Sequence, residues 1–195
     1  VLSIGATGKH YAQIVNGAPF DVFLAADSAR PERLEREGRS VPGSRFVYAV
    51  GELVAWAPRL PGLEFPAGLL DDSADRIAIA NPRLAPYGRA AQEALQALGA
   101  WDSVRPKIVR GENVGQALQF VHSGNADIGL VAHAQLLALG ESAVGSRWVV
   151  PRHLYSPIEQ QAVLLSDHAA ARAFLAYLQS AEAQALIRAG GYRTP

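Results

Sequence analysis

The sequence predicts an α/β protein of two lobes, each lobe a mainly parallel sheet flanked by helices. Short apolar runs alternate with helical patterns along almost the whole chain, which is typical of parallel βαβ units. Two longer apolar runs, at 45–57 and 158–165, are expected to cross between the lobes as a hinge of two strands. We therefore expect lobe I to comprise residues 1–51 plus 159–195, and lobe II residues 52–158.

The composition excludes several classes of function. The 195 residues include 18 Lys and Arg and 18 Asp and Glu, so the net charge is zero and nucleic acid is not an expected partner. The absence of cysteine excludes disulfides, thiolate metal sites and Cys nucleophiles. The absence of methionine means that a translation product does not begin at Val1, and we expect a preceding segment such as a cleaved signal peptide.

The first quarter of the chain predicts two strand and helix pairs. An apolar run at 1–4 is followed by the turn Gly-Ala-Thr-Gly at 5–8 and by a helical pattern that ends at an Asn-Gly signal. A second apolar run precedes Asp27 and Ser28, whose side chains can cap a helix. The expected elements are strands at 1–4 and 21–26 and helices at 9–16 and 31–37.

The middle of the chain repeats this pattern after a loop rich in Pro and Gly at 58–68. The helical pattern at 88–98 has an apolar stripe and is stopped by Gly99. We expect further strands at 76–80, 107–109, 127–132 and 148–150, the last at a sheet edge, and helices at 88–98, 114–123, 134–139, 168–179 and 181–189.

Three loops lie where an apolar run gives way to a helical pattern. They are the turn at 5–8, the loop Asn-Pro-Arg-Leu-Ala-Pro-Tyr-Gly at 81–88 and the loop Glu-Asn-Val-Gly-Gln at 112–116. An α/β protein presents free backbone N–H groups to an anion at such places. A single turn of this kind is more often an ordinary cap, but three of them favour an anion site.

The sequence contains no motif typical of an enzyme. It has no Gly-x-Ser-x-Gly motif, no pair of catalytic carboxylates and no phosphate-binding lysine motif, so we expect no catalytic residue and no cofactor. The five histidines are not spaced as metal ligands. The acidic group Asp71, Asp72 and Asp75 is more typical of a solvated loop than of a cation site.

Five blocks of residues occur in a fixed order, at 11–19, 21–27, 81–88, 112–117 and 124–129. Together they resemble the molybdate-binding periplasmic protein of ABC transporters, over the chain from about residue 3 to the C-terminus. The resemblance implies a type II periplasmic-binding-protein fold that closes on a tetrahedral oxyanion in the cleft between its lobes. It also implies molybdate and tungstate as ligands, an ABC permease in the inner membrane as partner, and a periplasmic location.

The resemblance also assigns the groups that hold the oxyanion. They are the N–H of Ala6, the hydroxyl groups of Thr7 and Tyr87, and the backbone N–H of Val114. Molybdenum would enter only as the oxyanion at these residues, with no site for a free metal ion. Molybdate, tungstate and sulfate offer only acceptors near neutral pH, so N–H and O–H donors suit them. Phosphate also stays a possible ligand, because it keeps one acidic proton that the carboxylate of Asp27 or Glu112 could accept.

Members of this family begin with one more strand and helix before the position of Val1, and the loop between them donates to the same anion. We therefore expect either an oligomer, swapped or paired through the incomplete lobe I, or a chain that is part of a longer product. Two alternatives for the function stay open at this point. One is a binder of another oxyanion or small anion on the same fold, and the other is the effector-sensing domain of a transcription regulator.

Overall fold

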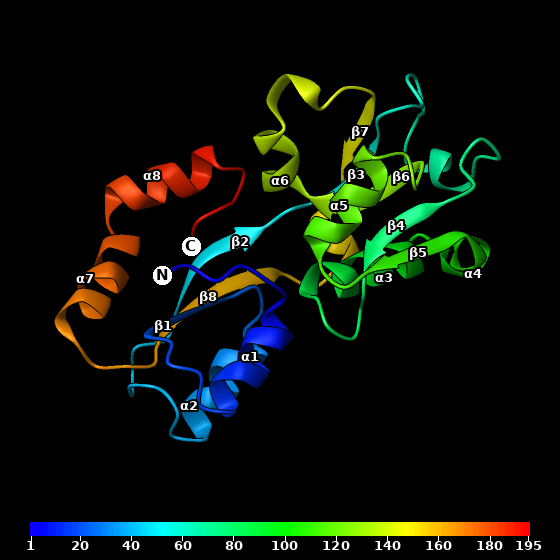
Figure 1. Cartoon of the computed structure of the whole chain (residues 1–195). Coiled ribbons are helices and arrows are strands. Elements are labelled where there is room, and N and C mark those ends of the chain that lie inside the picture. Colours follow the sequence, from blue (N-terminus) through cyan, green and yellow to red (C-terminus); the bar gives the residue numbers. More distant parts are fainter. The chain divides into compact units, whose positions relative to one another are not determined.

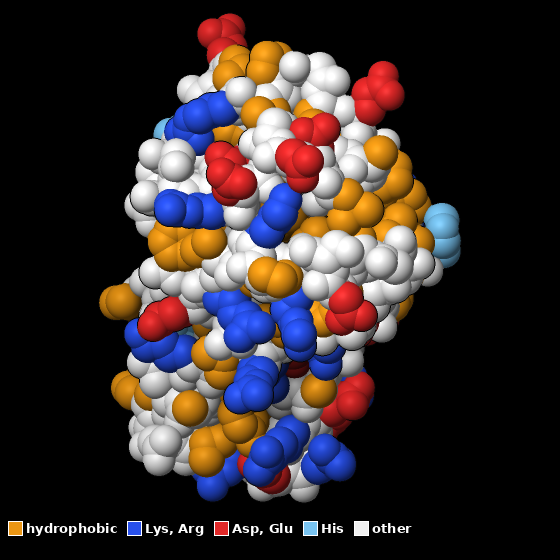
Figure 2. Space-filling view, turned by 90° about the vertical axis from the view of Figure 1, so that its right-hand side faces the viewer, with side chains coloured by type: hydrophobic (Ala, Val, Ile, Leu, Met, Phe, Trp, Pro, Cys, Tyr) orange, Lys and Arg blue, Asp and Glu red, His pale blue; other side chains and the backbone are white.

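The computed structural model describes all residues from 1 to 195, and the chain divides into two compact units (Figure 1). Unit 1 combines Val1–Gly51 with Ile158–Pro195, and unit 2 is Glu52–Pro157. On the face shown in Figure 2, acidic and basic side chains are interspersed, in keeping with the zero net charge. No helix has the length and apolar character needed to span a membrane.

Unit 1 is built on a sheet of three strands in the order β1-β8-β2. The strands are β1 (Val22–Ala25), β2 (Phe46–Gly51) and β8 (Ile158–Leu164). Both pairs are antiparallel, with Phe23 opposite Val163 and Gly51 opposite Ile158. The prediction of a mainly parallel sheet is therefore wrong for this unit.

The antiparallel pairing has a simple cause in the path of the chain. Strand β2 ends at Gly51, where the chain leaves unit 1, and β8 begins at Ile158, where the chain returns. Because these two residues are paired, the strand that leaves and the strand that returns must run in opposite directions. Strand β1 lies on the other side of β8 and is antiparallel to it as well.

Helices cover both faces of this sheet. Alternate residues of a strand point to opposite faces, and Val163 and Leu164 of β8 accordingly join two different apolar clusters. Val163 packs with Ile14 of α1 and Leu34 of α2, whereas Leu164 packs with Leu175 of α7. The helices of unit 1 are α1 (Thr7–Val15), α2 (Ala29–Arg36), α7 (Ala169–Leu178) and α8 (Ala181–Ala189).

The strand expected at 1–4 does not form. These residues pair with no other strand, and the side chains of Val1, Leu2 and Ile4 are exposed. An isolated extended segment has no neighbour for its backbone N–H and C=O groups, so an apolar run alone does not make a strand.

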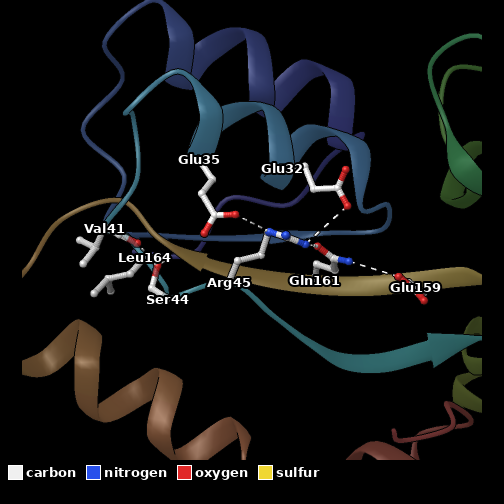
Figure 3. A network of polar contacts seen from close by, with 8 residues as sticks. All are labelled: Glu32, Glu35, Val41, Ser44, Arg45, Glu159, Gln161 and Leu164. Atoms are coloured by element: carbon white, nitrogen blue, oxygen red, sulfur yellow. Dashed lines mark hydrogen bonds and ion pairs between the residues drawn. The ribbon is translucent and has the colours of Figure 1, made fainter.

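A polar network around Arg45 holds α2 against the sheet of unit 1 (Figure 3). The Arg45 guanidinium donates to Glu35 at 2.9 Å and to the Gln161 side-chain oxygen at 3.0 Å, and it lies 3.5 Å from Glu32. Gln161 is only 3% exposed, and its amide nitrogen donates to Glu159 at 3.2 Å. One arginine thus links α2, the approach to β2 and the central strand β8.

Unit 2 contains a mixed sheet of five strands in the order β5-β4-β6-β3-β7. Strands β5, β4 and β6 are parallel, and β3 is antiparallel to both β6 and β7. The strand predicted near 148–150 is β7, and it lies at the sheet edge as expected. The strands are β3 (Leu53–Ala57), β4 (Ile77–Ala80), β5 (Ile108–Gly111), β6 (Ile128–Ala132) and β7 (Ser146–Val149).

The core of unit 2 depends on small residues between strand and helix. Gly129 of β6 lies so close to α5 that a Cβ there would be 2.5 Å from the Val121 side chain. Trp56 is fully buried, and its indole N–H donates to the Val144 carbonyl oxygen at 2.8 Å. The α-helices are α3 (Pro86–Ala97), α4 (Trp101–Val104), α5 (Val114–His122) and α6 (His133–Ala138), and the short 3₁₀ turns of the unit are Ala67–Leu70, Arg105–Lys107, Gly140–Ser142 and Arg152–Leu154.

Candidate functional site

The predicted turn at 5–8 forms the start of helix α1. Ala6 is the residue before the helix, and its carbonyl oxygen accepts from the N–H groups of Lys9 at 3.0 Å and His10 at 3.1 Å. The N–H groups of Thr7 and Gly8 precede these and have no acceptor within the helix. The positive end of the α1 dipole lies at the same place.

Thr7 is buried, with 6% of its surface exposed, and its hydroxyl group is fixed in place. The Thr7 oxygen accepts from the N–H of Ala26, directly after β1, at 3.2 Å. A hydroxyl group that accepts one hydrogen bond still has its own hydrogen to donate. The N–H of Ala6 and the hydroxyl group of Thr7 therefore lie on one turn, and the bond to Ala26 fixes the position of the hydroxyl group.

The Asp27 carboxylate was one of two that could accept the remaining proton of a phosphate ligand. In the structure it already accepts from donors of the protein. It is 5% exposed, it accepts from the Arg30 N–H at 2.9 Å, and it forms an ion pair with the Arg30 guanidinium. This pairing caps the start of α2. The carboxylate is thus engaged in the fold of unit 1.

Tyr87 lies in the first turn of α3, directly after Pro86 at the first helical position. Its side chain is 5% exposed. The next residue, Gly88, packs against the end of β4, where a Cβ would lie 2.2 Å from the Ala80 carbonyl oxygen. The absence of a side chain at Gly88 lets the start of α3 touch the strand, and this contact fixes the position of Tyr87.

The start of α5 has a reciprocal cap. The Asn113 side chain accepts from the Gln116 N–H at 3.0 Å, and the Gln116 side-chain oxygen accepts from the Glu112 N–H at 2.6 Å. The first bond along the helix runs from the Ala117 N–H to the Asn113 carbonyl oxygen at 3.2 Å. The N–H groups of Val114 and Gly115 have no acceptor within the helix.

Tyr87 and Val114 come to the same edge of the unit 2 sheet. Strands β4 and β5 are parallel neighbours, and their last residues, Ala80 and Gly111, are paired. The carboxyl ends of parallel strands meet at one edge, and this is where α/β proteins bind ligands. The four predicted residues therefore form two pairs, each positioned within its own unit.

The far end of α5 is also fixed. The Arg59 guanidinium donates to the carbonyl oxygens of Val121 at 2.9 Å and His122 at 3.0 Å. A cation at the last carbonyls of a helix stabilises its negative end. Helix α5 thus has a bound cation at its C-terminus and free N–H groups at its N-terminus.

Sequence reasoning did not identify the roles of Gly88 and Arg59. Glycine is unfavourable within a helix, so its presence at position 88 was a signal that the backbone there approaches a neighbouring segment closely. Arg59 gave none, because its partners lie 62 and 63 residues away. No group of three or more His, Cys, Asp or Glu side chains is placed to hold a metal ion.

Residues 1–193 match the family model of the bacterial extracellular solute-binding proteins. This chain belongs to that family. It is 45% identical to the molybdate-binding protein ModA of Rhodobacter capsulatus over 195 residues, which cover 98% of this chain and 76% of the relative. It is 46% identical to ModA of Azotobacter vinelandii over 196 residues, with 98% and 78% covered.

The solved structure of the Azotobacter vinelandii periplasmic molybdate-binding protein matches the fold with a TM-score of 0.93 and 43% identity, over 100% of this chain and 87% of that one. These similarities confirm the predicted resemblance and the α/β, two-lobed type II fold. The relatives are named as binding proteins and not as enzymes, in agreement with the sequence analysis.

Proposed function

We propose that this protein captures molybdate in the periplasm and delivers it to an ABC permease in the inner membrane. The observation that supports this most strongly is the identity of 45% and 46% with two proteins named ModA, over 98% of the chain. The family match over residues 1–193 includes all three loops at which an apolar run gives way to a helix.

We propose that the N–H of Ala6, the hydroxyl groups of Thr7 and Tyr87 and the N–H of Val114 hold the anion. Ala6 and Thr7 belong to unit 1, and Tyr87 and Val114 to unit 2, so we place the ligand between the units, as the type II fold implies. The free N–H groups at the starts of α1 and α5 support this assignment, since each adds the positive end of a helix dipole.

The chemistry of these groups suits a fully ionised tetrahedral dianion. All four are donors, and molybdate has only acceptors to offer. The Asp27 carboxylate is already paired with Arg30, which favours a dianion over a ligand that must donate a proton. Tungstate has the same charge and shape, so we propose that it binds too. Selectivity over sulfate would depend on cavity size, because the donor pattern is the same for both.

The proposed mechanism has three steps. An open form admits the anion, closure surrounds it with donors and removes its water, and the closed form docks on the permease. Ligand binding shifts the population toward the closed form because the anion contacts donors of both units only in that form.

Isothermal titration of the purified chain with molybdate tests this proposal, with tungstate, sulfate and phosphate titrated in parallel. We expect saturable binding of molybdate and tungstate and little heat with the other two anions. A sample that is folded by circular dichroism and binds phosphate or sulfate in preference would identify another oxyanion as the ligand. A folded sample that binds none of the four would refute the proposed function.

A further inference from the structure

Gln135 lies against the start of α5, although it belongs to another helix. It is the third residue of α6, which follows β6, the parallel neighbour of β4. A Cβ built on Gly115, the second residue of α5, would lie 3.5 Å from the Gln135 side-chain nitrogen Nε2. The Gln135 amide thus lies close to the turn that carries the free N–H groups of Val114 and Gly115, at a distance at which a side chain in place of Gly115 would touch it.

The Gln135 amide has no hydrogen-bond partner in the protein. Its oxygen Oε1 is buried and accepts from no donor, so no hydrogen bond of the protein holds this amide in place. Gln116, on the same turn of α5, provides the contrast, because its side-chain oxygen caps the Glu112 N–H at 2.6 Å. The side chain of Gln116 serves the fold, whereas that of Gln135 presents an amide to α5 without bonding to it.

The orientation of the amide determines what it can bind. Of the two polar atoms of the amide, Nε2 is the one that lies within 4 Å of the Gly115 Cβ position, at 3.5 Å, beside the Asn113 side-chain oxygen at 3.2 Å, and Nε2 carries two N–H donors and no acceptor. A donor beside two free backbone N–H groups has the same chemical requirement as they do, since all of them need an acceptor. A neutral amide adds this donor without the cost of placing a charge there.

On the basis of the proposed function, we propose that Gln135 is a further contact residue of the oxyanion site, donating from Nε2 to the anion held at the start of α5. It extends the donor set of unit 2 beyond Tyr87 and Val114. It also contributes to specificity, because an amide nitrogen favours a ligand that offers only acceptors and disfavours one that presents a hydroxyl hydrogen at this position.

Two substitutions test this proposal by titration with molybdate, tungstate and phosphate. Gln135→Leu keeps the approximate size of the side chain and removes the donor, and we expect roughly tenfold to hundredfold weaker binding of molybdate. Gln135→Glu has nearly the same shape and replaces the donor by a charged acceptor, so we expect a loss of at least about a hundredfold at pH 8.

The pH dependence separates a contact from a structural role. The carboxyl group introduced by Gln135→Glu can donate again once it is protonated, and a neighbouring dianion raises the pKa of a carboxyl group. The affinity of Gln135→Glu relative to wild type should therefore recover between pH 8 and pH 5.5. Gln119→Glu, on the exposed side of α5, adds the same charge to the same helix and should bind molybdate as wild type does.

The outcomes distinguish this inference from the proposed function. If wild type binds none of the tetrahedral anions, both fail together. If wild type binds molybdate and Gln135→Leu binds it equally well, Gln135 is not a contact and the inference alone is overturned. The same holds if Gln135→Glu loses no more affinity than Gln119→Glu, or if its loss does not change with pH. Thermal unfolding of each variant shows that it is folded.

Discussion

Replacing Gly88 by alanine should displace the start of α3 and with it Tyr87. A Cβ at this position would lie 2.2 Å from the Ala80 carbonyl oxygen and 2.8 Å from the Asn81 carbonyl carbon. Ordinary van der Waals contact begins at 3.4 Å, so the first of these atoms is more than 1 Å too close. Both are backbone atoms at the end of a buried strand, and no side-chain rotation relieves the contact.

The magnitude follows from two opposing terms. Overpacking costs about 1–3 kcal/mol, and a contact with backbone belongs at the upper end of that range. Alanine is favoured over glycine in a helix by about 1 kcal/mol. We therefore expect Gly88→Ala to lower the free energy of unfolding by about 2 kcal/mol, and Tm by about 4–8 °C in a chain of this size. Molybdate affinity should fall as well, because Tyr87 moves with the turn.

Urea denaturation and titration calorimetry measure the two effects. Gly190→Ala, at the end of α8, is the matched control, because its Cβ would lie 3.4 Å from the carbonyl oxygens of Leu186 and Ile187 and its φ is −77°. We expect that control to remain within about 0.5 kcal/mol of wild type. A Gly88→Ala protein that unfolds at the same denaturant concentration as wild type and binds molybdate equally well would refute the reasoning.

Three further predictions concern single side chains. Tyr87→Phe should weaken molybdate binding by about 1.5–3 kcal/mol in calorimetry, whereas the control Tyr177→Phe, on the exposed side of α7, should not; equal affinities would remove Tyr87 from the site. Asn113→Ala removes the cap of α5 and should lower the free energy of unfolding by about 1 kcal/mol, and an unchanged denaturation midpoint would contradict that role. Burial, with a smaller effect of Tyr192, raises the pKa of the Tyr48 hydroxyl group. The protonated hydroxyl group should therefore contribute fully to stability below the ordinary tyrosine pKa of about 10. This contribution should be lost as the pH rises above that value. Tyr48→Phe should reduce that alkaline loss in denaturation curves recorded from pH 8 to pH 11, and identical slopes for the two proteins would count against it.

Helices were predicted well because their signals are local. The pattern expected at 181–189 matches α8 at both ends, and Gly17, Gly38 and Gly99 follow helix ends with positive φ, as their glycine stops indicated. Most strand positions were also predicted, because buried strands are continuous apolar runs, but the single run expected at 45–57 is divided at Glu52 into β2 and β3. Strand direction was not, since alternation of strands and helices does not reveal which strands are neighbours.

The run at 1–4 shows the limit of the apolar signal. Its composition is that of a strand, but a strand exists only with a partner, and partners are a property of the fold. The sequence signals for the proposed site residues are equally uneven. Thr7 and Tyr87 have side chains that suggest a role, whereas Val114 would act only through its backbone and was proposed from the family resemblance. Gln135 gave no signal because its neighbour Gly115 is 20 residues away.

The central position of β8 in unit 1 determines when that unit can fold. In this sheet β1 and β2 each pair with β8 and not with each other (Figure 1), and Val50 of β2 also forms a bridge with Arg193 near the C-terminus. Residues 1–51 therefore contain no complete sheet of their own. A chain delivered from its N-terminus supplies the whole of unit 2, residues 52–157, before it supplies β8. Unit 2 can thus fold first, on the ribosome or behind a translocation pore. Strands β1 and β2 can pair only after β8 has emerged, more than 100 residues further along the chain.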